Sequence, residues 1–208
     1  MPRMVDTPPT PSPLAAPADT VNELTAARAA AAAAPTVPPT TAPALWVHPT
    51  LRFMLSHPAH IVALGAGAGL TRHAPGTAGT LWAWASFALL QPWLGDAGWA
   101  LLIGLGTLVG WWACTVTARH MGMADSGHIV IDEVLAFWLV LWLVTPASFW
   151  AQLVAFLLFR LFDAVKVGPM AWADRRFKGF GPRGGFGILL DDFVAALCTL
   201  LVIALWRY

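Results

Sequence analysis

The sequence predicts an all-α, polytopic membrane helical bundle of about five spans, preceded by a disordered tail rich in Ala and Pro. Of the 208 residues, 58% are hydrophobic and only 11% are charged, whereas soluble domains carry about 25% charged residues. In residues 1–47, Pro clusters flank a run of Ala, a composition typical of disorder. We therefore divide the chain into a low-complexity tail, residues 1–47, and a membrane-embedded domain, residues 48–208. The net charge of +1 gives no indication of a nucleic-acid partner.

Residues 51–70 are apolar but interrupted by Arg52, His57, Pro58 and spaced glycines. Because a membrane-spanning helix needs about 20 consecutive apolar residues, we expect this segment to be interfacial or re-entrant. Residues 71–80, with the sequence TRHAPGTAGT, have the composition of a loop, since Pro fixes the backbone and Gly permits a positive φ.

Five apolar runs follow, and we expect each to form a membrane-spanning helix: residues 80–94, 99–117, 129–144, 148–165 and 187–206. The connections at 95–98 and 145–147 contain no Lys or Arg, whereas the other connections contain Arg72, Arg119, Lys166, Arg175, Arg176, Lys178 and Arg183. Because basic connections stay in the cytoplasm, the tail is expected inside and the C-terminus outside. This multi-pass topology in the lipid bilayer places the ionisable residues at the cytoplasmic end of the bundle.

Acidic residues concentrate in the second half of the chain. Seven of the eleven lie between positions 125 and 192: Asp125, Asp132, Glu133, Asp163, Asp174, Asp191 and Asp192. Neighbouring residues on a helix diverge by about 100°, so one member of each adjacent pair can face the bundle interior. Carboxylate oxygens suit Mg²⁺, and the basic side chains nearby suit phosphate: Arg160, Lys166, Arg175 and Arg176. Together they predict phosphoryl chemistry on a lipid head group.

Each of these features also has a purely structural interpretation. Arg160 and Asp163, three residues apart on a helix, would neutralise each other. The pair at 191–192 would complement the dipole at a helix start, and residues 125–126 would cap the third span. These interpretations do not explain why four acidic sites from separate segments meet at one face of the membrane, so we retain the metal-and-phosphate hypothesis.

Four motifs, in the family's order, resemble phosphatidylglycerophosphatase A. Residues 74–81 (APGTAGTL) resemble its PGTxGS/TL loop, and residues 125–133 (DSGHIVIDE) resemble its DxxxIVxDE motif. Residues 159–166 (FRLFDAVK) resemble FRxFDxxKP. The Asp-Arg pair at 174–175 and residues 184–192 (GGFGILLDD) resemble the DRxxGGxGIMxDD ending.

The resemblance covers residues 60–208 and has some departures from the family pattern. Val167 replaces the proline that follows the lysine, and residues 179–183 form a short insertion. Ala136 and Ala196 stand where the family tends to have glycine. None of these departures removes an acidic or basic side chain.

The resemblance implies Mg²⁺-dependent hydrolysis of phosphatidylglycerophosphate to phosphatidylglycerol and phosphate, a step of phospholipid biosynthesis. It also implies a bacterial cytoplasmic (inner) membrane, with the active site facing the cytoplasm. The catalytic residues, which would ligate the metal or orient the attacking water, are Asp132, Glu133, Asp163, Asp191 and Asp192. The substrate-binding residues would be Arg160, Lys166, Arg175, Pro75, Gly76 and Thr77. Attack by water and attack by an aspartate through a phospho-enzyme both stay open.

Three other functions match the sequence less well. A second lipid phosphatase class has an SGH motif, as residues 126–128 do, but uses a later histidine, and none follows His128. The DxxDG start of CDP-alcohol phosphotransferases is missing. The main alternative is a non-catalytic or ion- or proton-carrying helical bundle, against which stand the lack of internal repeats and the position of the charges at one end. The oligomeric state is open, with a homo-oligomer as one alternative.

Overall fold

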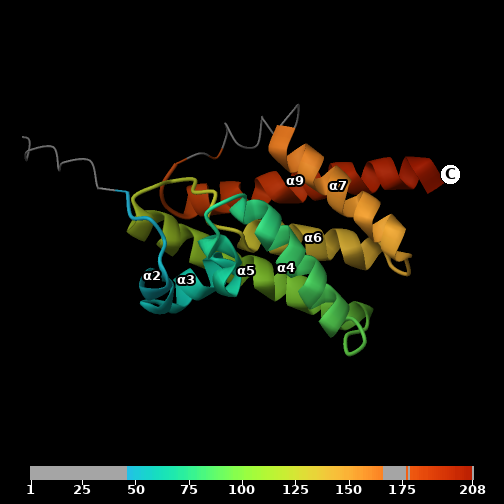
Figure 1. Cartoon of the computed structure of the whole chain (residues 1–208), viewed down its shortest axis with the longest axis horizontal. Helices are drawn as coiled ribbons and strands as arrows, with labels where there is room; N and C mark the ends of the chain where they lie inside the picture. The colour runs from blue at the N-terminus through green and yellow to red at the C-terminus, as the bar shows by residue number, and fades with distance from the viewer. Residues whose placement is uncertain (1–45, 166–176, 178, 208) are drawn as a thin grey trace, which may run out of the picture. The chain divides into compact units, whose positions relative to one another are not determined.

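A computed structural model describes residues 46–165, 177 and 179–207, and all regular structure in these ranges is helical (Figure 1). The elements are α2 (Leu51–Leu55), α3 (Pro58–Ala63), the 3₁₀ helix η1 (Gly65–Leu70), α4 (Pro75–Leu90), α5 (Asp96–Met121), α6 (Ile131–Val144), α7 (Phe149–Val165) and α9 (Pro182–Arg207). The predicted all-α class is confirmed for this part of the chain. The predicted disordered tail, residues 1–47, falls almost entirely outside the described residues and stays a prediction.

A helix lies at each of the five predicted spans, but the helices differ in length. Two are long and apolar enough to cross a membrane, α5 with 26 residues and a 25-residue stretch of α9. The other three are shorter, with 16 residues in α4, 14 in α6 and 17 in α7. The structure therefore supports a membrane protein with two candidate spanning helices, and the count of about five spans stays a prediction.

The starts of two helices differ from the prediction. The helix α9 begins at Pro182, not at residue 187, because proline is well suited to the first position of a helix. Asp191 and Asp192 are thus more than two turns inside α9, so the interpretation that they complement a dipole at its start is wrong. Similarly, α4 begins at Pro75, and the predicted loop at 71–80 is wrong from that residue onward.

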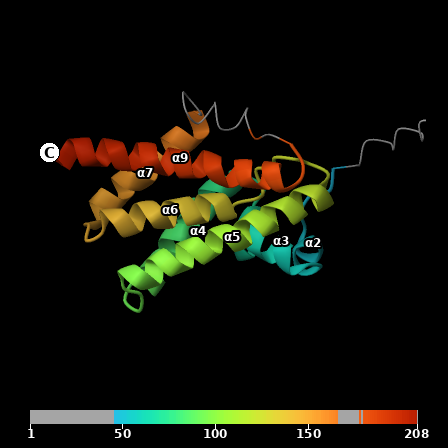
Figure 2. The same cartoon turned by 180° about the vertical axis from the view of Figure 1, so that it is seen from behind.

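Helix α6 is the centre of the bundle and packs against α4, α5, α7 and α9. In Figure 2 it lies between α9 and α5. Its side chains Phe137, Val140 and Leu141 have no solvent exposure. Because lipid tails are as apolar as these side chains, close packing and not the hydrophobic effect holds such helices together. Gly106 and Gly110 of α5 provide it, since a methyl group on either would press on Leu135 of α6.

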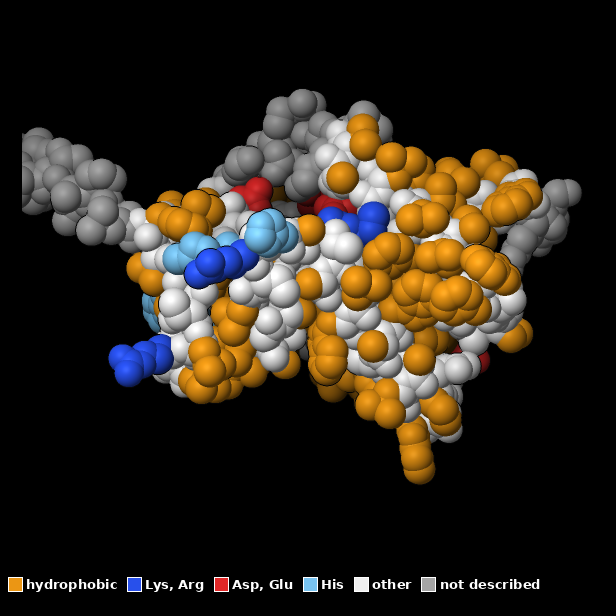
Figure 3. Space-filling model, viewed as in Figure 1, with side chains coloured by type: hydrophobic (Ala, Val, Ile, Leu, Met, Phe, Trp, Pro, Cys, Tyr) orange, Lys and Arg blue, Asp and Glu red, His pale blue; other side chains and the backbone are white. Residues whose placement is uncertain are grey.

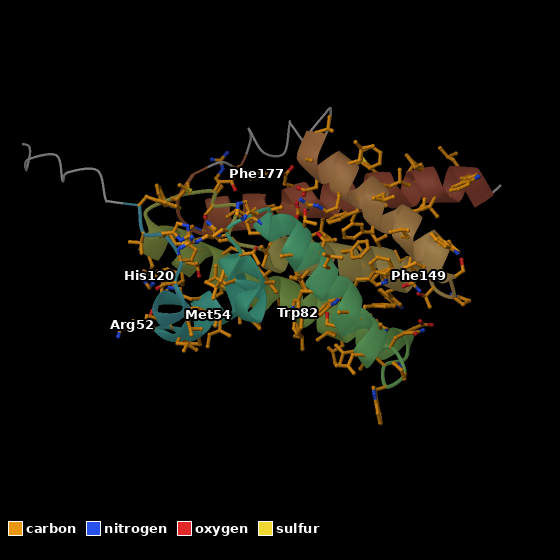
Figure 4. All side chains as sticks on the ribbon, viewed as in Figure 1. Arg52, Met54, Trp82, His120, Phe149 and Phe177 are labelled. Atoms are coloured by element: carbon orange, nitrogen blue, oxygen red, sulfur yellow. The ribbon has the colours of Figure 1, made fainter. Side chains whose placement is uncertain are left out.

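The segment 51–70 is broken into short helices, as its interruptions predict. It is attached to the rest of the bundle by polar contacts. The buried His60 shares a hydrogen bond of 2.8 Å with His120 of α5, a residue labelled in Figure 4. The N–H of Val130 donates to the carbonyl of Ala63 at 2.9 Å, and His128 Nδ1 lies 2.7 Å from the carbonyl oxygen of Gly69. The segment thus supports the chain just before α6, and its interfacial or re-entrant position stays a prediction.

Candidate metal centre

Three acidic side chains from two helices meet inside the bundle. Asp132 and Glu133 lie in the first turn of α6, and Asp192 lies on α9, which packs along α6. All three are buried, and each offers an oxygen atom such that these atoms lie within 4.8 Å of one another. Both members of the adjacent pair on α6 can be buried because other helices surround α6 on several sides.

Asp163 and Asp191 line the same cavity, so one space brings together all five acids that the sequence predicts. The cavity has a volume of about 360 Å³. Its other walls come from the segment before α6, which includes Asp125 and Ser126, and from the start of α9, which includes Gly184 and Gly187. Figure 3 shows acidic and basic side chains gathered beside an extended apolar surface.

Arg160 of α7 is a basic side chain that contacts this cluster within the described residues. Its Nη1 donates to Asp163 Oδ2 at 2.5 Å and to Glu133 Oε1 at 3.5 Å. The first contact confirms that Arg160 and Asp163 pair along their helix. The second shows that Arg160 does more than neutralise its neighbour, because it also joins α7 to the acidic end of α6.

Thr80 is a site residue to which sequence reasoning gave no role. The side chain is fully buried, donates a hydrogen bond of 2.9 Å to the carbonyl of Gly76, and accepts one of 3.4 Å from Arg160 Nη1. It therefore ties Arg160 to the first turn of α4. The signal that could have identified it is its place in the APGTAGTL motif at residues 74–81.

The first turn of α4 approaches Glu133 closely because it contains glycine. A Cβ atom on Gly76 would overlap Glu133 Oε1, and one on Gly79 would lie 3.2 Å from Glu133 Oε2. Just before this turn, Ala74 has a left-handed backbone with φ 48, and Pro75 occupies the start of the helix. Pro75, Gly76 and Thr77 thus stand at a helix N-terminus, where first-turn N–H groups have no intrahelical acceptor.

The remaining predicted roles divide as follows. The interpretation that residues 125–126 cap the third span is wrong, because the residue that precedes α6 is Val130 and no side chain caps this helix. Lys166 and Arg175, predicted to bind substrate, lie outside the described residues, as do Arg176 and Lys178. Their roles stay predictions.

The chemistry of the cluster fits a hard cation. Within the described residues, Asp132 Oδ1 and Glu133 Oε2 are buried and have no hydrogen-bond partner. Carboxylates this close repel one another strongly in a low-dielectric interior, and buried polar atoms are expected to have partners. A cation at the cluster would meet both requirements, and an all-oxygen donor set suits Mg²⁺, Mn²⁺ or Ca²⁺.

Comparisons with known proteins show which family the chain resembles. A family model described as Phosphatidylglycerophosphatase A matches residues 61–207. The chain is 37% identical over 149 residues to Phosphatidylglycerophosphatase A of Escherichia coli (strain K12), which covers 71% of this chain and 83% of the relative. It is 34% identical over 161 residues to the protein of the same name from Haemophilus influenzae. This match covers 77% of this chain and 96% of the relative.

A third relative has a different name. The chain is 34% identical over 156 residues to a "Putative phosphatidylinositol-3-phosphatase" of Bacteroides thetaiotaomicron, covering 71% of this chain and 92% of the relative. No solved structure matches the chain. The range matched by the family model includes all of the site residues described above and none of residues 1–47, so the resemblance and the cavity concern the same part of the chain.

Proposed function

We propose that this chain, which belongs to the phosphatidylglycerophosphatase A family and is a phosphatase, hydrolyses phosphatidylglycerophosphate to phosphatidylglycerol and phosphate with Mg²⁺ as its cofactor. The observation that carries the proposal is the buried cluster of Asp132, Glu133 and Asp192. Two candidate spanning helices and the bacterial relatives support a place in a bacterial membrane. A cytoplasmic orientation of the site and a role in phospholipid biosynthesis belong to the same proposal.

Asp132, Glu133 and Asp192 would hold the metal ion. A bound Mg²⁺ supplies positive charge that polarises the phosphoryl group and stabilises its transition state. The two buried carboxylate oxygens without hydrogen-bond partners in the described part of the chain, on Asp132 and Glu133, support this assignment.

The phosphate would be held between Arg160 and the N-terminus of α4. The Nη2 atom of Arg160 lies beside Gly76, where a Cβ atom would be 3.1 Å from it. First-turn N–H groups of a helix bind phosphate oxygens well, and a guanidinium adds charge-assisted hydrogen bonds. Gly76 and Thr77 would supply the N–H groups, and Pro75 would fix the start of the turn. Lys166 and Arg175 would add positive charge, on the family resemblance alone.

Asp163 and Asp191 line the cavity beside the metal cluster and would orient the nucleophile. In the hydrolysis, an oxygen of water forms a bond to phosphorus, the ester P–O bond breaks, and the leaving oxygen receives a proton to become an alcohol of phosphatidylglycerol. A carboxylate that accepts a hydrogen bond from this water aligns it for attack. If ³²P-labelled substrate quenched in acid leaves labelled aspartyl phosphate, attack goes through the phospho-enzyme.

The test is phosphate release from phosphatidylglycerophosphate by the purified protein in detergent, with Mg²⁺ and with a chelator. We expect release to require the metal and to fall about 100-fold in Asp192→Asn, the size of effect typical of losing one group that stabilises the transition state. The matched control is Asp96→Asn. Asp96 is the first residue of α5, does not line the acidic cavity, and accepts a hydrogen bond from Trp142. Its variant should therefore keep full activity.

Other outcomes separate the alternatives. The assay also offers phosphatidylinositol 3-phosphate as a second test substrate, because the third relative is named a putative phosphatidylinositol-3-phosphatase. Release from this lipid but not from phosphatidylglycerophosphate would overturn the substrate assignment and keep the phosphatase. Release that is insensitive to the chelator would refute the role of the metal cluster.

A further inference from the structure

Helices α4 and α7 both reach the candidate site, and each presents a largely apolar face that extends away from the site. On α4, Thr77, Leu81, Ala85 and Ala88 follow one another at helical spacing, so they lie on one face. On α7, Phe149, Gln152, Phe156 and Arg160 do the same. Each face begins at a residue proposed to contact the phosphate, Thr77 on α4 and Arg160 on α7.

The two faces enclose a groove of about 440 Å³, which is lined by Leu81, Trp84, Ala85, Ala88, Phe149 and Gln152. Leu81 is 50% exposed and Phe149 is 62% exposed, so the groove opens at the surface of the bundle. Figure 4 shows Phe149, which carries a label, at the end of α7 far from the site. The two alanines leave the hollow between the larger side chains.

Contacts between α4 and α7 close the inner side of this groove. The indole N–H of Trp84 donates to Gln152 Oε1 at 2.7 Å. The ring of Trp84 also stacks on Phe149 and on Phe156, with centroids 5.4 Å and 5.7 Å apart. Nearer the site, Arg160 and Thr80 join the same two helices. The groove is therefore a formed surface feature, and its wall on α4 begins at Leu81, one helical turn beyond Thr77.

The depth of the groove matches the position of a lipid chain. Trp84 is eight residues beyond Gly76, and Gln152 is eight residues before Arg160, which at 1.5 Å per residue places both about 12 Å from the phosphate end. The head-group layer of a bilayer is about 5–8 Å thick on each side. A lipid whose terminal phosphate lies at Gly76 and Arg160 would thus have acyl chain, not head group, at the level of the groove.

We propose that the groove between α4 and α7 binds an acyl chain of the lipid substrate and positions its phosphate at the site. This inference rests on the proposed function and adds a binding subsite to it. Any exposed apolar face in a membrane contacts lipid. This groove is distinguished because both of its walls end at the phosphate-binding residues, so that one molecule can occupy the groove and the site together.

The test fills the groove with Ala88→Trp and compares two substrates, dioleoyl and dibutanoyl phosphatidylglycerophosphate. The butanoyl chains end before they reach Ala88, which lies twelve residues, about 18 Å of helix, beyond Gly76. We expect kcat/KM for the dioleoyl lipid to fall about tenfold, equivalent to about 1.4 kcal/mol, mainly through KM, with the dibutanoyl lipid unaffected. The matched control is Ala100→Trp, which places the same side chain at an exposed alanine on α5 and should change neither substrate.

Three results would go against the proposal in distinguishable ways. Full activity of Ala88→Trp on the dioleoyl lipid would mean that the groove holds only bulk membrane lipid. Equal losses on both substrates would mean that the substitution moves α4, and this result would also overturn the proposal. If the wild-type protein released phosphate from neither lipid, the proposed function itself would fail.

Photolabelling tests the proposal without depending on enzyme activity. A diacyl phosphatidylglycerol with a photoreactive diazirine in the middle of one chain should label residues 81–88 and 149–152 of the wild-type protein, and Ala88→Trp should reduce this label. Label spread evenly over all exposed apolar helices would overturn the proposal.

Discussion

Replacing Gly76 with Ala should separate the chemistry of the site from the stability of the fold. A Cβ atom at this position would overlap Glu133 Oε1, and it would lie 3.2 Å from Glu133 Cδ. Because nonbonded heavy atoms settle about 3.5 Å apart, the carboxylate has to move by about 1 Å or more. This displacement changes the position of one of the three proposed metal ligands relative to Asp132 and Asp192.

The two consequences of Gly76→Ala should differ greatly in size. A misplacement of about 1 Å in a catalytic arrangement costs about 100-fold in rate, so kcat should fall by that factor and more Mg²⁺ should be needed for half-maximal activity. Stability should change little, since crowding costs about 1–3 kcal/mol and alanine is about 1 kcal/mol better than glycine within a helix. Phosphate release at several Mg²⁺ concentrations, with thermal unfolding in the same detergent, measures both.

The control for this variant is Gly104→Ala. Gly104 also lies in a helix, α5, but a Cβ atom there would meet no other atom within 4 Å. Its variant should keep the wild-type kcat and metal requirement. Wild-type kinetics in Gly76→Ala would refute the reasoning, because they would mean that the position of Glu133 against α4 does not matter for the reaction.

Two further predictions concern buried polar groups. Thr80→Val removes the hydroxyl that joins Arg160 to Gly76 and should lower kcat/KM about tenfold, which is about 1.4 kcal/mol. Thr80→Ser keeps a hydroxyl and should keep the wild-type kcat/KM. Equal losses in both variants would contradict the role of the hydroxyl. Burial lowers the pKa of His60, against the raising effect of its hydrogen bond to the Phe53 carbonyl, and His120 and His57 lower it further. The unfolded chain then binds the proton more readily, so stability should fall as the pH drops below about 6.5. Thermal unfolding should show a smaller fall in His60→Gln, and an unchanged pH dependence would exclude His60 as its source.

The convergence of the acids could be predicted from sequence because it depends on a few strong signals. A charged pair inside an apolar run is costly unless it has partners, so pairs such as Asp132 and Glu133 indicate a shared site before any fold is known. The structure brings both of these residues together with Asp192. What the sequence could not show is where each helix begins and ends: the run at 80–94 includes a turn after Leu90, and the run at 129–144 begins two residues before α6.

Both errors at helix starts have one physical cause. Glycine and proline favour loops in isolation, so residues 71–80 were predicted to be a loop, and the fifth span was predicted to begin only at residue 187. In the structure the glycines that precede these predicted starts lie within helices and make close contacts: Gly79 with Val130, and Gly185 with Thr115. Small residues let membrane helices approach each other. Packing then outweighs the low helix propensity of glycine, and local composition alone does not reveal it.

The packing beneath the acidic cluster argues for a site that acts at one surface of the bundle. Asp132 and Glu133 are in the first turn of α6, and Phe137, one turn further along, is fully buried. Its ring packs on Phe159 and Phe156, with centroids 5.4 Å and 5.9 Å away. An ion or proton carrier needs polar groups that continue from its binding site toward the opposite side. Here a layer of aromatic rings follows the carboxylates directly, an arrangement that lowers solvent access and strengthens the electrostatic interactions of the charged groups at the cluster.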